Sequence, residues 1–84
     1  MKVVKTTPAP KELTLATSKA FGELIRYRRT SLGLTRETAA QLSNMNTQTL
    51  AKIENGNELV GLNNALKVAK ELGIQIHFSI GEDQ

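Results

Sequence analysis

The chain of 84 residues has no cysteine and no tryptophan, and its aromatic residues are limited to one tyrosine and two phenylalanines. Without cysteine, neither a disulfide nor a thiolate metal site can stabilise the fold. Because there is also only one histidine, the sequence offers no credible ligand set for zinc. The shortage of aromatic side chains argues against an RNA-binding module, since such modules stack bases on aromatic rings.

The sequence also has no apolar run long enough to cross a membrane and no signal-peptide pattern, so we expect a cytoplasmic protein. It has no glycine-rich phosphate loop and no Ser/His/Asp set, and its one pair of adjacent acidic residues, Glu82 and Asp83, ends a polar tail. We therefore expect neither an enzyme nor a cofactor. A chain of this length forms one small domain with a marginal core, and a second subunit is the obvious further source of buried surface.

Positive charge is concentrated in the first part of the chain. Residues 1–36 contain eight Lys or Arg and two acidic residues, whereas residues 37–84 contain three Lys and six acidic residues. The net charge of the whole chain is +3. This asymmetry favours a polyanionic partner on one side of the molecule.

Residues 1–14 form a basic arm that contains three lysines. Pro8 and Pro10 exclude a helix here and favour an extended backbone before each proline. Two interpretations are open. The arm is either a frayed terminus or a segment that follows DNA phosphates or enters the minor groove.

Residues 15–73 have the apolar spacing of helices, with glycine or asparagine at the ends. We expect four helices, at about residues 17–31, 35–44, 46–55 and 62–72. Gly22 lies inside the first of them, where it costs about 1 kcal/mol relative to alanine, and it therefore predicts the close approach of another helix. The inner stripe of the fourth helix is predicted to be Leu62, Ala65, Leu66, Ala69 and Leu72.

Residues 34–56 read as two short helices joined by a tight turn. Asn44 suits a left-handed backbone at the turn, and Asn46 can cap the helix that follows. Leu50 and Ile53 of that helix face inward. A helix with small and polar side chains on its outer face suits the major groove of DNA. The outer residues are Thr47, Gln48, Ala51, Lys52 and Asn55.

Residues 74–80 alternate between apolar and polar side chains and therefore predict a β-strand, followed by a polar tail at 81–84. No other stretch offers a partner strand, and a lone strand leaves its backbone groups unpaired. We therefore expect pairing with the same strand of a second copy across a two-fold axis, in a homodimer. An edge-paired or unstructured tail is the alternative. The residues expected to be buried between the copies are Ile74, Ile76, Phe78 and Ile80.

An ordered set of residues between Phe21 and Leu72 matches a known pattern. The set is Gly22, Ile25, Arg29, Gly33, Leu34, Thr35, Ala40, Asn44, Met45, Leu50, Ile53, Glu54 and Gly56. With this set the chain resembles the Cro/phage-repressor (XRE) type of helix-turn-helix domain. Asn44 stands where glycine is usual, and Arg36 stands where glutamine is commonest. The resemblance implies a mostly α, four-helix Cro/repressor-like domain with a C-terminal β-strand in an intersubunit sheet.

The residues Ala40-Gln41-Leu42-Ser43 before the turn, together with the alternating strand, are similar to the antitoxin/autorepressor branch named after HipB. This resemblance implies a sequence-specific, double-stranded DNA-binding transcriptional repressor that acts on a palindromic operator. It further implies the antitoxin of a HipBA-like toxin–antitoxin operon, which autoregulates its promoter and binds a kinase-like toxin.

The resemblance also assigns roles to individual residues. Residues that read bases would be Thr47, Gln48, Ala51 and Lys52. The amide of Gln48 can bond N6 and N7 of adenine, and Lys52 can reach guanine O6 or N7. Residues that bind phosphates would be Thr35, Arg36, Asn46, Thr49, Asn55 and Arg29. Arg29 and Glu54 occupy the positions at which relatives form a salt bridge between the first and third helices.

A protein–protein adaptor with the same fold that does not bind DNA is the alternative. Leu24, Leu59 and Val60 would then form an apolar patch for a partner protein. An adaptor does not require polar side chains at positions such as Gln48 and Lys52, and this feature discriminates between the two hypotheses.

Overall fold

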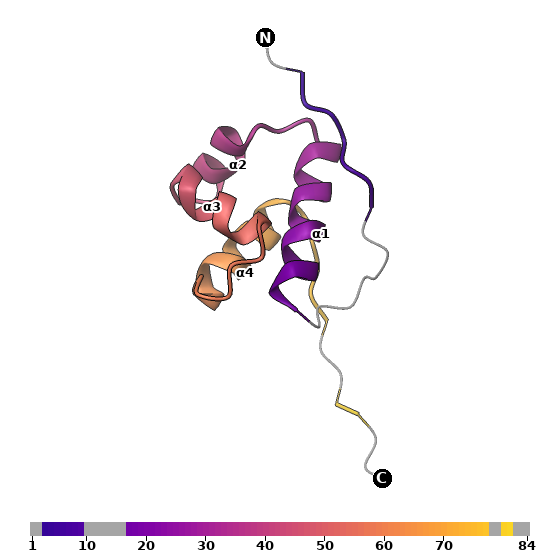
Figure 1. Cartoon of the computed structure of the whole chain (residues 1–84), viewed down its shortest axis with the longest axis vertical. Helices are drawn as coiled ribbons and strands as arrows, with labels where there is room; N and C mark the ends of the chain where they lie inside the picture. Colours follow the sequence, from indigo (N-terminus) through magenta and orange to yellow (C-terminus); the bar gives the residue numbers. More distant parts are fainter. Residues whose placement is uncertain (1–2, 10–16, 78–79, 82–84) are drawn as a thin grey trace.

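The computed structural model describes residues 3–9, 17–77 and 80–81. In this part of the chain, four helices follow one another around a single core (Figure 1). They are α1 (Ser18–Ser31), α2 (Arg36–Leu42), α3 (Thr47–Glu54) and α4 (Leu62–Glu71). Each overlaps the helix predicted from the sequence, so the helical part of the predicted fold class is confirmed.

Three of the helices begin at a side-chain cap. The hydroxyl of Thr17 accepts the Ala20 N–H at 3.0 Å at the start of α1. Thr35 accepts from the Thr38 N–H in the same way, at 3.2 Å. These caps satisfy backbone donors that have no partner within a helix, and each contributes about 0.5–2 kcal/mol.

All four helices end in the same hydrogen-bonded turn. The first residue beyond the helix cap has a positive φ angle in each case: Gly33, Asn44, Gly56 and Gly73. At the end of α2, for example, Asn44 N–H donates to Gln41 O and Met45 N–H donates to Ala40 O. This is the Schellman arrangement, and asparagine is the residue other than glycine that best tolerates its left-handed backbone. The predicted turn at Asn44 is confirmed by its φ of 55°.

Gly22 is the closest point between α1 and α3. A β-carbon at residue 22 would lie 2.2 Å from Ile53 O and 2.8 Å from Glu54 O, which are both backbone atoms of α3. No side chain fits there, so the close approach predicted from Gly22 is confirmed. The glycine brings α3 against α1 at backbone distance and fixes the position of α3.

The buried face of α4 differs from the predicted stripe. The inward spacing of i, i+3, i+4 and i+7 starts at Ala65 and continues through three buried residues, Val68, Ala69 and Leu72. Leu62 and Leu66 lie beside this stripe and are 72% and 40% exposed, so the prediction that they face inward was wrong. Both stripes of α4 are apolar, and periodicity alone could not choose between them.

The part of the N-terminal arm that the structure describes, residues 3–9, runs beside α1 (Figure 1). The Thr7 N–H donates to the hydroxyl of Thr30 at 2.9 Å, and the Thr6 hydroxyl lies 3.5 Å from Thr30 O. Thr30 is buried beneath this contact. Thr6 and Thr7 are therefore bonded to α1, while residues 1–2 and 10–14 of the predicted arm lie outside the described part.

The predicted strand at residues 74–80 is not confirmed. Residues 78 and 79, and with them Phe78, lie outside the described part of the chain, and no strand is formed over residues 74–77. Ile74 and Ile76 are half-buried against the core of their own chain, whereas Ile80 is 98% exposed. Intersubunit pairing therefore stays a prediction, and two of its four apolar residues already have an intramolecular role.

Within the described residues, no helix combines the length and the apolar character needed to cross a membrane. The same residues contain no group of three or more His, Cys, Asp or Glu side chains placed to hold a metal ion.

Candidate nucleic-acid interface

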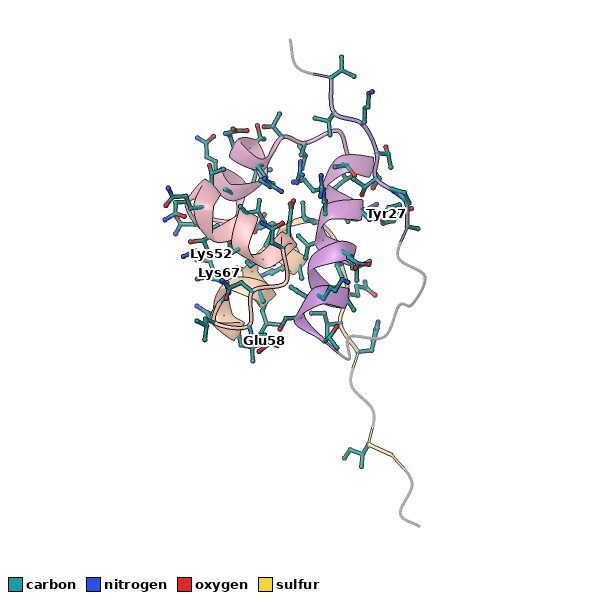
Figure 2. The ribbon with its side chains drawn as sticks, viewed as in Figure 1. Tyr27, Lys52, Glu58 and Lys67 are labelled. Carbon is teal, nitrogen blue, oxygen red and sulfur yellow. The ribbon has the colours of Figure 1, made fainter. Side chains whose placement is uncertain are left out.

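Helix α3 presents two different faces. Leu50 and Ile53 are buried in the core, and Glu54 is buried beside α1. On the opposite side Gln48 and Lys52 are exposed, and Lys52 points away from the body of the domain (Figure 2). Thr47 and Ala51 are half-buried, and each directly precedes one of these two exposed residues in the sequence. The four residues predicted to read bases are therefore brought together on one accessible helix, with their side chains free of any hydrogen bond between described residues.

The start of α3 is built around Asn46. Its side-chain Oδ1 accepts the Thr49 N–H at 2.7 Å, and the residue is exposed. The cap uses the amide oxygen, so the amide NH₂ group of this exposed residue remains as a donor. Asn46 can therefore cap the helix and donate to a phosphate at the same time, as predicted. Thr49 is half-buried and is held by the same cap.

Helix α3 is locked to α1 by a buried ion pair between Arg29 and Glu54. Arg29 Nε donates to Glu54 Oε2 at 2.6 Å and Arg29 Nη2 donates to Oε1 at 3.1 Å, a bidentate geometry. Arg29 Nη1 donates to Leu34 O at 2.7 Å. The salt bridge expected from the resemblance is present. Three of the five N–H donors of Arg29 have internal acceptors and its side chain is 8% exposed, so its proposed second role at a phosphate rests mainly on positive potential.

Arg36 joins the same carboxylate from α2. Its Nε donates to Glu54 Oε1 at 3.1 Å, and its side chain is one-third exposed. Glu54, whose side chain is fully buried, therefore ties α1, α2 and α3 together. The sequence predicted Arg36 only as a phosphate ligand, and this second ion pair was missed. The family pattern could not predict the Arg36–Glu54 ion pair, because glutamine is the commonest residue at the position of Arg36.

The two remaining predicted phosphate ligands, Asn55 and Thr35, differ in whether their side chains are already hydrogen-bonded within the domain. Asn55 is exposed at the C-terminal end of α3. Thr35 caps α2, and its hydroxyl also donates to the Thr38 hydroxyl at 3.1 Å. A phosphate at Thr35 would have to replace that bond. The backbone N–H groups at the start of α2 lie beside it, and they favour an anion at the helix end.

Two further basic residues, which the sequence did not single out, hold the C-terminal ends of helices. Lys67 Nζ lies 3.3 Å from Asn44 O, at the turn between α2 and α3. Arg28 Nε donates to Leu72 O at 2.8 Å, at the end of α4. Figure 2 shows Lys52 and Lys67 on the side of the domain opposite to Tyr27. Of the three arginines of α1, only Arg26 is exposed, whereas Arg28 and Arg29 are bound within the domain.

Two short helices joined by a tight turn, with the second packed on its apolar side and polar on its outer side, define a helix-turn-helix protein. A family model described as helix-turn-helix matches residues 25–78. The chain belongs to this helix-turn-helix family, of the Cro/phage-repressor (XRE) type.

Known structures similar to the chain include regulators of several kinds. The restriction-modification controller protein C.AhdI from Aeromonas hydrophila is 38% identical, over 69% of this chain and 88% of that chain, with a TM-score of 0.62. The clp gene regulator ClgR from C. glutamicum is 26% identical, over 69% of this chain and 75% of that chain, also with a TM-score of 0.62. No curated protein matches the chain.

A chain of the HipA–HipB–O2–O3 complex has a higher TM-score of 0.74, over 84% of this chain and 100% of that chain. Its sequence identity is 14%, so this likeness concerns the fold alone. Family membership and the named regulators together support a DNA-binding transcriptional regulator.

Proposed function

We propose that the protein is a sequence-specific repressor that binds a palindromic double-stranded operator as a two-fold homodimer. The observation that carries this proposal is the accessible outer face of α3, held on its inner side by Gly22 and by the Arg29–Glu54 ion pair. A helix fixed in this way can enter the major groove without losing the orientation of its side chains.

Bases are read by the outer face of α3. The amide of Gln48 makes a bidentate contact with adenine, and Lys52 donates to guanine O6 or N7. The hydroxyl of Thr47 donates, accepts or touches a thymine methyl, while Ala51 lets the backbone approach closely. Each bidentate contact contributes about 1–3 kcal/mol of discrimination between bases.

Phosphates on either side of the groove are bound by side chains around the ends of α2 and α3. Asn46 offers its amide NH₂ group and Asn55 is exposed, while Arg36 is held by Glu54 through Nε only. Its outer guanidinium nitrogens remain for a charge-assisted contact with a phosphate. Thr35, Thr49 and the positive potential of Arg29 complete this set. These contacts fix the position of the protein on the duplex without reading sequence.

The dimer is formed by the C-terminal segment. Ile80 is almost fully exposed. On the exposed side of α4, Leu62 and Leu66 line one apolar hollow with Phe21 and Ile76. Two copies joined here across a two-fold axis would place their α3 helices in half-sites roughly 34–36 Å apart, or a small multiple of that distance. A chain lacking residues 74–84 should sediment as a monomer, and a truncated chain that stays dimeric would remove the tail from the interface.

From the HipB-like fold and tail, we favour the biological role of an antitoxin, which represses its own promoter and binds a kinase-like toxin. The 38% identity with a restriction-modification controller protein supports a second role, as the controller of such a system. Co-expression distinguishes the two. An antitoxin should co-purify with, and neutralise, a toxic kinase-like protein from its own operon, whereas a controller should bind the promoter of a restriction-modification system.

A gel-shift titration against the DNA upstream of the protein's own gene tests the shared part of the proposal. We expect a discrete complex whose affinity falls steeply as salt rises, because each neutralised phosphate adds about −0.9 to the slope of log K against log salt. Absent binding, or binding insensitive to salt on every promoter fragment, would favour the adaptor hypothesis instead.

A further inference from the structure

The point at which the chain leaves α4 is held by a side chain of α1. Arg28 Nε donates to Leu72 O at 2.8 Å, across 44 residues of sequence. A β-carbon at Gly73 would lie 3.4 Å from Arg28 Nη2, so the guanidinium also lies against the turn itself. Arg28 is half-buried in this position. The contact therefore belongs to the folded domain and is not a loose surface pair.

Two backbone hydrogen bonds close the helix at this point. Gly73 N–H donates to Lys70 O at 3.0 Å and Ile74 N–H donates to Ala69 O at 2.9 Å. These two bonds close the helix, but they leave the carbonyl of Leu72 without a backbone partner, and Arg28 supplies the missing donor. Beyond the turn, the chain passes beside α1 (Figure 1), and Ile76 lines the same hollow as Phe21.

The neighbouring residue on α1 makes the corresponding contact to the DNA-reading helix. Arg29 binds Glu54 of α3, while Arg28 binds the end of α4. Two consecutive residues of one helix thus connect the element proposed to read DNA and the segment proposed to join two copies. One contact therefore holds α3 and the other holds the start of the tail.

We propose that Arg28 is a positioning residue that sets the spacing between half-sites accepted by the dimer. This inference rests on the proposed function, because it presumes that the tail joins two copies on DNA. The tail leaves the domain at this point, so a displacement comparable to the rise of roughly 3.4 Å for one base pair would change the half-site spacing that the dimer accepts.

Three substitutions at Arg28 separate the hydrogen bond from the charge. Arg28→Gln is neutral and places an N–H donor at the same distance along the side chain as Nε. Arg28→Met is neutral, has similar length and places a methyl group there. Arg28→Lys keeps the charge but has a methylene at that position. Arg26→Met removes the same charge from an exposed site of the same helix and serves as the control.

The experiment uses the full-length chain and a palindrome obtained by selection from random DNA with the unaltered protein. Affinities are measured by fluorescence anisotropy for this palindrome, for versions with one or two base pairs inserted or removed at its centre, and for a single half-site. We expect the unaltered protein, Arg28→Gln and Arg26→Met to lose about tenfold or more in affinity per base pair of altered spacing. Arg28→Met should bind the half-site as the unaltered protein does, but with a flat or shifted spacing profile.

A spacing profile of Arg28→Met that matches the unaltered protein would overturn the inference. So would a proportional loss on half-site and palindrome, because that result would mean only that the domain is destabilised. If Arg28→Met does not fold, Arg28→Lys is the second variant, because it moves the donor one bond further along the side chain and should therefore shift the spacing profile. If the unaltered protein selects no palindrome, or accepts every spacing equally, the proposed function itself fails, and the role of Arg28, which rests on it, fails with it.

Discussion

Removing the charge of Glu54 is the sharpest test of how α3 is held. The substitution Glu54→Gln keeps the size and shape of the side chain but leaves Arg29 and Arg36 without their carboxylate. Both oxygens of Glu54 are engaged, one with Nε of Arg29 at 2.6 Å and the other with Arg29 Nη2 and Arg36 Nε at 3.1 Å each. The side chain of Glu54 is fully buried and that of Arg29 is 8% exposed, so neither can exchange its partner for water.

The expected loss of stability is large for a domain of this size. Breaking a buried ion pair by removing one partner costs about 3–5 kcal/mol, because the remaining charge is left uncompensated. A chain of this length has a total unfolding free energy of about 4–13 kcal/mol. Each kcal/mol lowers the melting temperature of a small domain by about 4–8 °C. Glu54→Gln should therefore melt far below the unaltered protein.

The measurement is urea denaturation followed by circular dichroism, at one protein concentration because dimer formation would contribute to stability. Glu58→Gln, in the exposed loop between α3 and α4, removes the same charge and should change stability by less than about 0.5 kcal/mol. A stability of Glu54→Gln within about 1 kcal/mol of the unaltered protein would refute the claim that this carboxylate joins the three helices.

Three further predictions concern the packing around α3. Ser43 Oγ is buried without a hydrogen-bond partner among the described residues, so Ser43→Ala should leave stability unchanged or raise it by up to about 1 kcal/mol in the same denaturation assay; a loss would mean that the hydroxyl has a partner. Gly22→Ala should lower the free energy of unfolding by about 1–3 kcal/mol and weaken DNA binding, whereas Gly61→Ala, whose added methyl group meets open space, should be tolerated. Equal melting temperatures for the two variants would contradict the close approach of α1 and α3. Arg29→Met should lower stability by about 3–5 kcal/mol, and the affinity of its folded fraction for DNA decides its second role, because an unchanged affinity would exclude a contribution at the phosphates.

The sequence was sufficient to predict the helices and their ends, because these depend on local chemistry. The cap at Thr35 and the left-handed turn at Asn44 involve residues a few positions apart, and both follow from residue type. The approach of α3 to Gly22 was also predictable, since a glycine inside a helix is costly without a close neighbour.

The contacts made by long side chains could not be predicted in the same way. Arg28, Arg36 and Lys67 each reach an acceptor at least 18 residues away, and nothing in their local sequence distinguishes them from solvated residues. The orientation of α4 was also ambiguous, because Leu66 and Val68 belong to two equally apolar stripes and only the packed core decides between them. The contacts of Arg28 and Arg36 were therefore predicted less well than the helices that these arginines hold in place.

The central claim is that the outer face of α3 reads base sequence, and the most direct test is the base discrimination of Gln48→Ala. Anisotropy titrations would compare the selected palindrome with versions carrying single base-pair changes in each half-site. The unaltered protein should lose about 1–3 kcal/mol at each base pair that it reads. Gln48→Ala should lose discrimination at one position and keep it at the others. If Gln48→Ala weakened binding to every sequence equally, or discriminated as well as the unaltered protein, α3 would not read bases through this residue.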